Sequence, residues 1–548
     1  MARLWTAFAA SFLLAVSAVA QTTPSAAAPE QHDHAHGPAG QFGRVHFETS
    51  CAPAVAAEFD RGLALLHSFW FSAAIESFSR VLQADPNCAM AHWGIAMSWW
   101  SNPFGTTRSP QAMKAGLAAT DAAKSLPGGT PRERAYLAAV DVLYRDAATR
   151  DQRTRIVAYE QAMSALADAY PKDVEARIFY ALALAQSALP TDKSYANQLE
   201  AASILEEEFA KQPEHPGLAH YIIHSFDVPP LASRGLGAAR RYATIAPDAP
   251  HALHMPSHTF TRLGLWQDSI DTNLRSAEAA HRDAGAASEE LHALDYQAYA
   301  YLQTAQDAAA RRTIDLVPAL KQAIPNAGAG NAAPPSAGYY AVAAIPARYA
   351  LERNDWAAAT ALVPPKAPNA WADAVTHFAR ALGFAHLGKV DEARAEATRL
   401  AEIRDAVRAT NDSYWTDQVD IQRIGAEAWA AFAAGRRDEA LALMREAATR
   451  EDATEKAAVT PGPIKPAREL LGDMLLEMKR PADALAAYEA TLTKEPNRFR
   501  ATYGAAVAAQ AAGKKQKAIA HFAQLLEMCR KADATARPEL EEARKATR

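Results

Sequence analysis

Residues 213–258 read PEHPGLAHYIIHSFDVPPLASRGLGAARRYATIAPDAPHALHMPSH, and this stretch contains the same motif twice. His220 and His224 lie four residues apart, and His254 and His258 repeat this pair further along the chain. The step from one pair to the next is about 34 residues, the period typical of a repeat unit made of two antiparallel helices. The stretch therefore predicts stacked helical hairpins that carry equivalent histidines on one shared face.

The composition favours helix along nearly the whole chain. Ala, Leu, Glu, Lys and Arg are abundant, whereas Gly contributes only 25 of the 548 residues. This length exceeds what a single hydrophobic core organises, so we expect a long array or several domains. The net charge of −5 comes from well-mixed charges without a basic stripe, which argues against a nucleic-acid partner.

Small and aromatic residues mark further hairpins outside the histidine stretch. Ala74 and Phe78, followed by Pro86, fit a pattern in which a small residue lets two helices approach and an aromatic ring fills the next gap. Ala484 and Ala518 occupy the same small position of successive units, one repeat period apart. The chain therefore resembles the tetratricopeptide-repeat (TPR) superfamily, which implies an all-α fold, a tetratricopeptide-type α-solenoid of stacked helical hairpins.

Two segments, Ser50–Trp100 and His251–Gly264, also resemble an uncharacterised group of exported bacterial TPR proteins. This resemblance implies no particular activity, because the TPR fold is a scaffold that serves many functions. The superfamily implies protein–protein interaction, with a protein or peptide partner bound in a concave groove that the first helix of each unit lines.

The first twenty residues have the features of a secretion signal. Arg3 supplies a positive start, Leu4–Val19 is largely apolar, and Ala18–Ala20 gives a small-residue cleavage site. We therefore expect an exported, periplasmic protein without a transmembrane segment after signal cleavage. An uncleaved anchor is the alternative, although the apolar run is shorter than the ~20 residues that span a bilayer.

Prolines and glycines interrupt the helical periodicity at two places, which divides the chain further. The expected organisation is a signal peptide at 1–20, a disordered His-containing tail at 21–45, an N-terminal TPR-like array at 46–324 with an insertion near 101–131, a linker at 325–337, and a C-terminal TPR-like array at 338–548 that ends in a capping helix.

The repeated histidines predict a site for a transition metal, and the alternatives are contact with a peptide or small ligand, or plain surface and packing positions. Side chains four residues apart on a helix have Cβ atoms about 5–6 Å apart, and packed helices lie about 8–10 Å apart. Neutral imidazole is a good ligand for Zn, Cu or Fe. The candidate ligands are His220, His224, His251, His254 and His258, and Asp227 is expected either to add an oxygen ligand or to orient an imidazole.

Pro256 argues against this simple arrangement. It lies between His254 and His258, removes one backbone hydrogen bond, and predicts either a kink or a helix that begins near Met255. If the helix begins there, His251 and His254 lie on a loop and the shared face is lost.

Other residues are candidates for contact with a ligand or peptide. The equivalent groove positions hold His67, Trp93, Met97, Trp100 and Arg262. The tail residues His32, His34 and His36 are either a weak metal site or a solvated cluster. Cys51 and Cys88 are the nearest pair among three cysteines, and both a disulfide and buried free thiols fit the spacing.

Three functions therefore stay open after the sequence alone. The first is an exported scaffold that binds a protein or peptide, and the second is a metal-binding or carrier protein that uses the His220, His224, His254 and His258 cluster. An enzyme ranks last, because no H-E-x-x-H glutamate, phosphate loop, nucleophile elbow or Cys-x-x-Cys pair appears.

Overall fold

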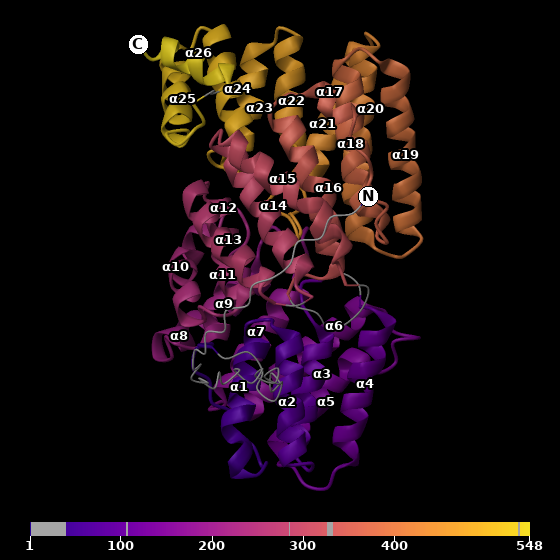
Figure 1. Cartoon of the computed structure of the whole chain (residues 1–548), viewed down its shortest axis with the longest axis vertical. Coiled ribbons are helices and arrows are strands. Elements are labelled where there is room, and N and C mark those ends of the chain that lie inside the picture. Colours follow the sequence, from indigo (N-terminus) through magenta and orange to yellow (C-terminus); the bar gives the residue numbers. More distant parts are fainter. Residues whose placement is uncertain (2–39, 106–107, 284, 326–331, 535–536) are drawn as a thin grey trace. The chain divides into compact units, whose positions relative to one another are not determined.

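The described part of the chain is helical throughout and contains no strand. The computed structural model describes residue 1 and residues 40–548, except 106–107, 284, 326–331 and 535–536. The expected signal peptide and the three tail histidines therefore lie outside the described residues. Within Gly40–Arg548, successive helices pack as antiparallel pairs (Figure 1). The predicted all-α solenoid of stacked helical hairpins is confirmed.

The first helices of the array form consecutive pairs. The pairs are α1 (Ala56–His67) with α2 (Phe71–Ala84), α3 (Ala89–Trp100) with α4 (Pro110–Ser125), α5 (Pro131–Tyr144) with α6 (Gln152–Ala169), α7 (Val174–Ser187) with α8 (Ala196–Lys211), α9 (Pro216–Ser225) with α10 (Leu236–Ile245), α11 (Pro250–His254) and α12 (Pro256–Arg262) with α13 (Trp266–His281), and α14 (Ala287–Gln303) with α15 (Asp307–Gln322). Two short 3-10 turns, η1 (Pro53–Val55) and η2 (Ala232–Gly235), precede α1 and α10.

The remaining helices continue the same pattern to the last helix. They are α16 (Pro335–Glu352) with α17 (Trp356–Thr360), α18 (Ala370–His386) with α19 (Val390–Arg408), α20 (Ser413–Ala433) with α21 (Arg437–Asp452), α22 (Ala467–Glu477) with α23 (Pro481–Lys494), α24 (Phe499–Ala511) with α25 (Lys515–Met528), and finally α26 (Pro538–Ala546), which packs on α25.

Glycines explain how aromatic rings lock neighbouring hairpins together. The ring of Phe78 on α2 lies between Gly62 on α1 and Gly94 on α3, and a Cβ at Gly94 would come within 2.4 Å of this ring. Tyr488 on α23 lies in the same way between glycines of α22 and α24. Any larger residue at these glycines would force the helices apart, so the small-aromatic pattern in the sequence reports a real packing constraint.

The described chain is ordered and packed at two places where the sequence predicts a disordered tail or a linker. Residues 40–45 belong to the range expected as a disordered tail, yet Phe42 is buried against Trp70 and the Gln41 amide donates to Asp248. At the other boundary, α16 packs directly on α14. The described residues that flank the expected linker are also buried, so the stacking of first helices continues from one expected array into the next.

Helix α4 occupies most of the expected insertion near 101–131 and serves as the partner of α3. The cysteines of the N-terminal region form a disulfide, Cys51–Cys88, which joins the segment before α1 to the start of α3. Cys529, at the end of α25, is a buried free thiol. No helix among the described residues combines the length and the apolar character that crossing a bilayer requires.

Proline 256 interrupts a helix without displacing the histidines on either side. Helix α11 ends at His254 and α12 begins at Pro256, but Met255 between them keeps helical angles, with φ −54° and ψ −35°. Pro256 stands at the first position of α12, where a helix does not need the missing N–H. His251, His254 and His258 therefore stay on one helical path, and the kink leaves their shared face intact.

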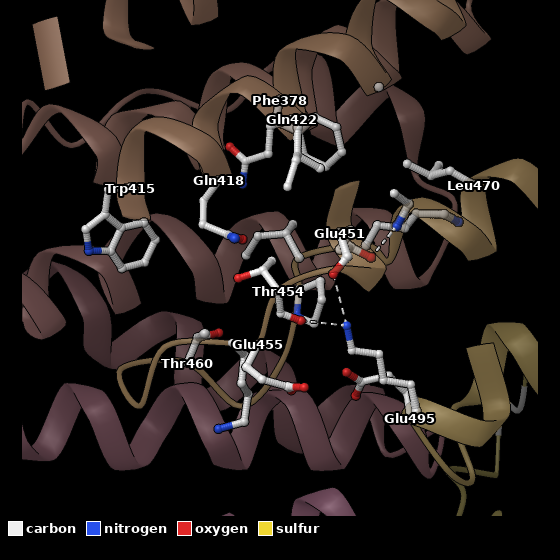
Figure 2. Close-up of a pocket in the computed structure, with 18 of the residues that line it drawn as sticks. Phe378, Trp415, Gln418, Gln422, Glu451, Thr454, Glu455, Thr460, Leu470 and Glu495 are labelled. Atoms are coloured by element: carbon white, nitrogen blue, oxygen red, sulfur yellow. Dashed lines mark hydrogen bonds between the residues drawn. The ribbon is translucent and has the colours of Figure 1, made fainter. Parts of the chain in front are cut away.

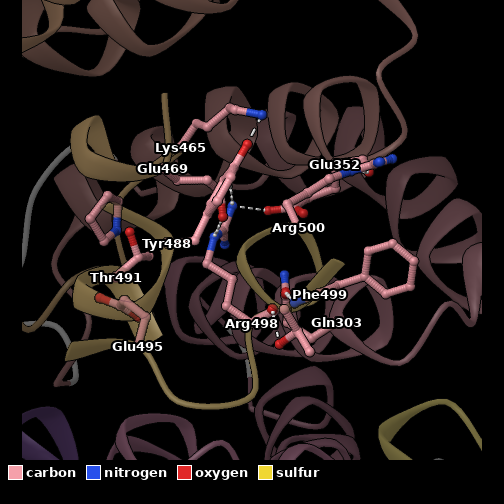
Figure 3. A network of polar contacts seen from close by, with 12 residues as sticks. Gln303, Glu352, Lys465, Glu469, Tyr488, Thr491, Glu495, Arg498, Phe499 and Arg500 are labelled. Atoms are coloured by element: carbon pink, nitrogen blue, oxygen red, sulfur yellow. Dashed lines mark hydrogen bonds and ion pairs between the residues drawn. The ribbon is translucent and has the colours of Figure 1, made fainter. Parts of the chain in front are cut away.

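The segment 453–466, between α21 and α22, links distant parts of the chain. Arg348 on α16 is fully buried, pairs with Asp295 on α14, and donates to the carbonyl groups of Gly462 and Pro463. A second buried network surrounds Arg498, which pairs with Glu352 and Glu469 (Figure 3). These charges hold the segment 453–466 and the start of α24 against α14 and α16.

Candidate metal centre

Six imidazoles from successive first helices meet in the interior of the array. The six are His220 and His224 on α9, His251 and His254 on α11, His258 on α12, and His292 on α14. The first five are the predicted metal ligands, whereas His292 was not among the candidates. Five of the six are buried and His224 is half-buried. They divide into two groups of three, and within each group one ring nitrogen per residue lies within 4.8 Å of the others.

The first group, triad 1, consists of His220, His224 and His251. The Nε2 atoms of His220 and His224 are 3.1 Å apart. The Nδ1–H of His220 donates to the carbonyl oxygen of His67 over 2.7 Å. The Nδ1 of His251 faces a carboxylate oxygen of Glu289 at 3.1 Å, and its buried Nε2 has no hydrogen-bond partner.

The second group, triad 2, consists of His254, His258 and His292. The Nε2 atoms of His254 and His258 are again 3.1 Å apart. The Nδ1 of His254 lies 2.7 Å from the Oδ1 atom of Asn273, and that of His258 lies 2.9 Å from Asp227 Oδ2. His292 hydrogen bonds to the backbone of Val459, while its buried Nδ1 has no partner.

The hydrogen-bond partners of triad 2 fix where its protons lie. Asn273 presents its oxygen to His254, since its amide nitrogen donates to the Ser269 carbonyl. Asp227 is an acceptor only. Both Nδ1 atoms are therefore protonated, so in the neutral rings both Nε2 atoms carry lone pairs. Two lone pairs that face each other across 3.1 Å repel, and a cation between them removes that repulsion.

Tyr296 on α14 does not supply the missing proton. Its hydroxyl lies 3.3 Å from His258 Nε2 and 3.5 Å from Nδ1, and these nearly equal distances place it over the face of the ring. Its shortest polar contact is with the carbonyl oxygen of Thr460, at 3.1 Å. The hydroxyl therefore donates to the segment 453–466, and the Nε2 lone pair of His258 stays free.

Asp227 lies behind His258 and not among the facing nitrogens. Arg262 Nε donates to its Oδ1 over 2.8 Å, and Lys456 Nζ lies 3.1 Å from its Oδ2. Burial raises the pKa of Asp227, but Lys456 and Arg262 together bring it well below its usual value. Of the two roles expected for Asp227, the geometry matches the one that orients an imidazole.

Burial keeps the imidazoles neutral. It lowers the pKa of His220, His224 and His254 well below 6.5, and the neighbouring histidines lower it further. The pKa of His292 is lowered in the same way. Burial lowers the pKa of His258 to about 4, against the opposing effect of Asp227. Neutral rings are the form that binds a metal ion.

Aromatic residues and a late segment of the chain cover the cluster. The ring of Phe104 stacks on His224 at 4.1 Å between centroids, and Phe69 contacts His220 edge-on. A cavity of about 330 Å³ lies beside the cluster. Its walls include Phe104, Glu289 and Val459, each of which contacts one of the six histidines, so this cavity is separated from the cluster by single side chains.

The residues expected to line an open groove are buried instead. Exposure of the side chains of His67, Trp93, Met97, Trp100 and Arg262 ranges from 0% to 7%. His67 belongs to another buried group, in which Glu175 accepts hydrogen bonds from both His67 and His215. The three others pack in the N-terminal core and Arg262 pairs with Asp227. These five positions therefore do not form a peptide groove in this structure.

A second, smaller cavity has Arg262 on α12 and Tyr340 on α16 in its walls, together with residues from later in the chain. It measures about 50 Å³ and is lined by residues of α18 and α20 and of the segment 453–466 (Figure 2). The Lys494 ammonium donates to the carbonyl groups of Glu451 and Thr454 beside it. Burial raises the pKa of Glu451 to about 7. None of these residues stands out in the sequence, because they come from segments distant in the chain.

His292 is the functional candidate that sequence reasoning missed, and a signal for it was present. His224, His258 and His292 follow one another at the same repeat period, so all three occupy the same position of the unit. The signal is easy to overlook because Ser288, not histidine, stands four residues before His292. The third unit therefore lacks the i, i+4 pair that marks the two units before it.

Comparison with known proteins gives little beyond this geometry. No family model matches the sequence, and no curated protein matches it. Among solved structures, the chain is similar to the crystal structure of the P58(IPK) TPR domain, with 15% identity, a TM-score of 0.20, and coverage of 68% of this chain and 98% of that one. The fold assignment made above rests on the observed stacking of helical hairpins.

Proposed function

We propose that this chain is an exported helical-repeat protein that holds a transition metal in its six-histidine cluster. The observation that carries the proposal is the pair of unprotonated nitrogens, His254 Nε2 and His258 Nε2, 3.1 Å apart. Two imidazoles bound to one metal at 2.0–2.1 Å place their nitrogens about 2.8–3.4 Å apart, for angles between square and tetrahedral. The observed separation falls in this range.

The outer contacts of the histidines support the same interpretation. Metal-binding histidines usually donate their second N–H to a carbonyl, carboxylate or amide oxygen, which fixes the ring. His220, His254 and His258 each do so, through the His67 carbonyl, Asn273 and Asp227. Without a metal, the unpartnered Nε2 of His251 and Nδ1 of His292 would each cost about 1–3 kcal/mol of unmet hydrogen bonding. Zn, Cu and Fe all suit such a ligand set.

Peptide binding through the predicted groove has less support, because the residues assigned to it are buried. A protein partner stays a prediction for other surfaces of the scaffold. Export also stays a proposal, to which the Cys51–Cys88 disulfide lends support, since such bonds persist in oxidising compartments.

Elemental analysis of the tag-free mature protein tests the metal proposal. We expect at least about one transition-metal ion per chain, and a loss of at least about half of it in the His254→Ala/His258→Ala variant. His46→Ala/His281→Ala is the matched control, because both of these imidazoles are largely exposed and lie outside the cluster. Less than about 0.2 ion per chain after incubation with Zn, Cu and Fe, unchanged by the first variant, contradicts the proposal.

A further inference from the structure

The six histidines fall into two triads that share one arrangement of ring nitrogens. Each triad has one pair of Nε2 atoms 3.1 Å apart, and each adds a third imidazole with one buried nitrogen that has no partner. In triad 1 the third ring is that of His251, and in triad 2 it is that of His292. Among the described residues, ring nitrogens that all lie within 4.8 Å of one another come from three of these histidines at a time, so the six do not surround a single ion.

The two triads lie in direct contact. The ring centroids of His251 and His254 are 5.8 Å apart, and those of His224 and His258 are 6.0 Å apart. Imidazoles of triad 1 therefore pack directly against imidazoles of triad 2. Ions bound in the two triads would therefore be close neighbours.

The charge around the cluster limits which ions fit. All six ligands are imidazoles, and an imidazole that binds a metal contributes no charge. The charged groups that contact the histidines are Asp227 and Glu289, and those that contact Asp227 are Arg262 and Lys456. The formal charges of these four groups cancel. Two divalent ions would bring four uncompensated positive charges into this buried space, whereas two monovalent ions would bring only two.

We infer that the cluster is a binuclear copper site, in which triad 1 and triad 2 each hold one copper(I) ion. The inference rests on the proposed function and specifies its stoichiometry and its metal. Imidazole suits copper, and among the candidate metals Zn, Cu and Fe only copper has a common singly charged ion. Three nitrogen ligands also leave each ion a free position, and the cavity of about 330 Å³ gives small molecules an approach to it.

Titration of the metal-free mature protein with copper(I) under anaerobic conditions, in competition with a chromophoric copper(I) chelator, counts the sites. We expect two ions per chain for the wild type and one for each of two matched double variants. The variants are His220→Ala/His251→Ala, which removes triad 1, and His254→Ala/His292→Ala, which removes triad 2. Circular dichroism confirms that each variant is folded, and His46→Ala/His281→Ala should bind two ions.

Oxidation of the bound copper(I) ions to copper(II) with ferricyanide tests whether the two ions lie close together. Two neighbouring copper(II) ions interact magnetically, so the wild type should give an electron paramagnetic resonance signal that is broadened or diminished per copper. Each double variant should give the full signal of one isolated copper(II). Wild-type copper with two full, independent signals would overturn the inference of a binuclear centre.

The remaining outcomes separate this inference from the proposed function. If the wild type binds one ion per chain and both double variants lose it, the six histidines form a single shared site. This result overturns the binuclear inference and leaves metal binding intact. Two zinc ions that an equal concentration of copper(I) does not displace would overturn the assignment to copper. No metal under any condition would overturn the proposed function itself.

Discussion

Asp227 and Lys456 lie 229 residues apart in the sequence, yet Lys456 Nζ is 3.1 Å from Asp227 Oδ2. The same oxygen accepts the Nδ1–H of His258 over 2.9 Å. A cation from the segment before α22 thus contacts the carboxylate that orients a histidine of the cluster. The site is formed by two distant parts of the chain, and residues on both sides should control its affinity.

Replacing Asp227 with Asn should weaken metal binding about 10–100-fold, because the amide binds the His258 N–H less strongly and lacks the negative charge. Chelator competition on the folded variant measures the change. Glu469→Gln is the control, since this buried carboxylate pairs with Arg498 and Lys465 instead. It should lower stability and leave metal affinity at the wild-type value. Equal affinity in the Asp227 variant would show that the carboxylate does not act on the site.

Replacing Lys456 with Met should have the opposite effect on affinity. The Lys456 charge disfavours positive charge on His224, His258 and His292, as its lowering effect on their pKa values shows. Its removal should therefore strengthen the binding of a metal cation by about 3–10-fold. Lys193→Met, which removes an ammonium that pairs with Glu455, is the comparison. A weaker affinity in the Lys456 variant would mean that the ammonium mainly holds the covering segment in place.

His386 should make the protein sensitive to acid. It stacks between Trp356 and Trp429, and burial lowers its pKa to about 4, with a smaller contribution from Lys465. The unfolded chain binds a proton below about pH 6.5, whereas the folded chain does so only near pH 4. Its contribution to stability is therefore complete above pH 6.5 and is lost as the pH falls toward 4.

The variant His386→Phe keeps an aromatic ring between the two tryptophans and cannot titrate. Between pH 6.5 and pH 4, the free energy of unfolding should fall less in this variant than in the wild type. The difference between the two decreases should be about 2–3 kcal/mol. Urea unfolding at several pH values measures both curves. Parallel curves would show that His386 is protonated in the folded protein across this range.

Arg498 should be among the most sensitive positions for stability. Its guanidinium is fully buried with Glu352 and Glu469, so Arg498→Ala leaves two carboxylates without their cation (Figure 3). We expect a loss of about 3–5 kcal/mol in the free energy of unfolding. Arg399→Ala, which removes an exposed ion pair with Glu402 on α19, should change it by less than about 1 kcal/mol. Similar values for the two variants would contradict the importance of the network.

The disulfide gives a further test. Cys51 and Cys88 close a loop with a sequence separation of 37 residues. Cys51→Ser/Cys88→Ser should lower the free energy of unfolding by about 2–4 kcal/mol, mainly because the unfolded chain gains freedom. Cys529→Ser, at a buried free thiol, is the control for replacing a cysteine as such. If added reductant destabilises the wild type no more than the double variant, the bond does not form in solution.

The sequence predicted the fold and part of the site because both depend on local spacing. Helical periodicity and the regular step between units reflect packing between neighbouring hairpins, so His220, His224, His254 and His258 follow from it. Pro256 predicted a kink between His254 and His258, but Met255 keeps helical angles and the shared face is retained.

The rest of the site depends on contacts that no local pattern records. Asn273 and Glu289 fix ring orientations from other helices, and Lys456 arrives from far along the chain. Burial was also unpredictable, since equivalent groove positions are open to solvent unless a distant segment fills the groove. That segment, and with it the enclosed character of the cluster, emerges only from the three-dimensional packing.

The order of the covering segment in the chain has a consequence for biogenesis. All six histidines belong to helices that end by Gln303, whereas the residues that close over them begin at Ala453. During synthesis from the N-terminus, all six imidazoles have thus been made while the 245 residues after Gln303 are still to come. An ion captured at that stage would bind before the segment 453–466 covers the cluster, so folding of the later helices would take place on an already occupied site.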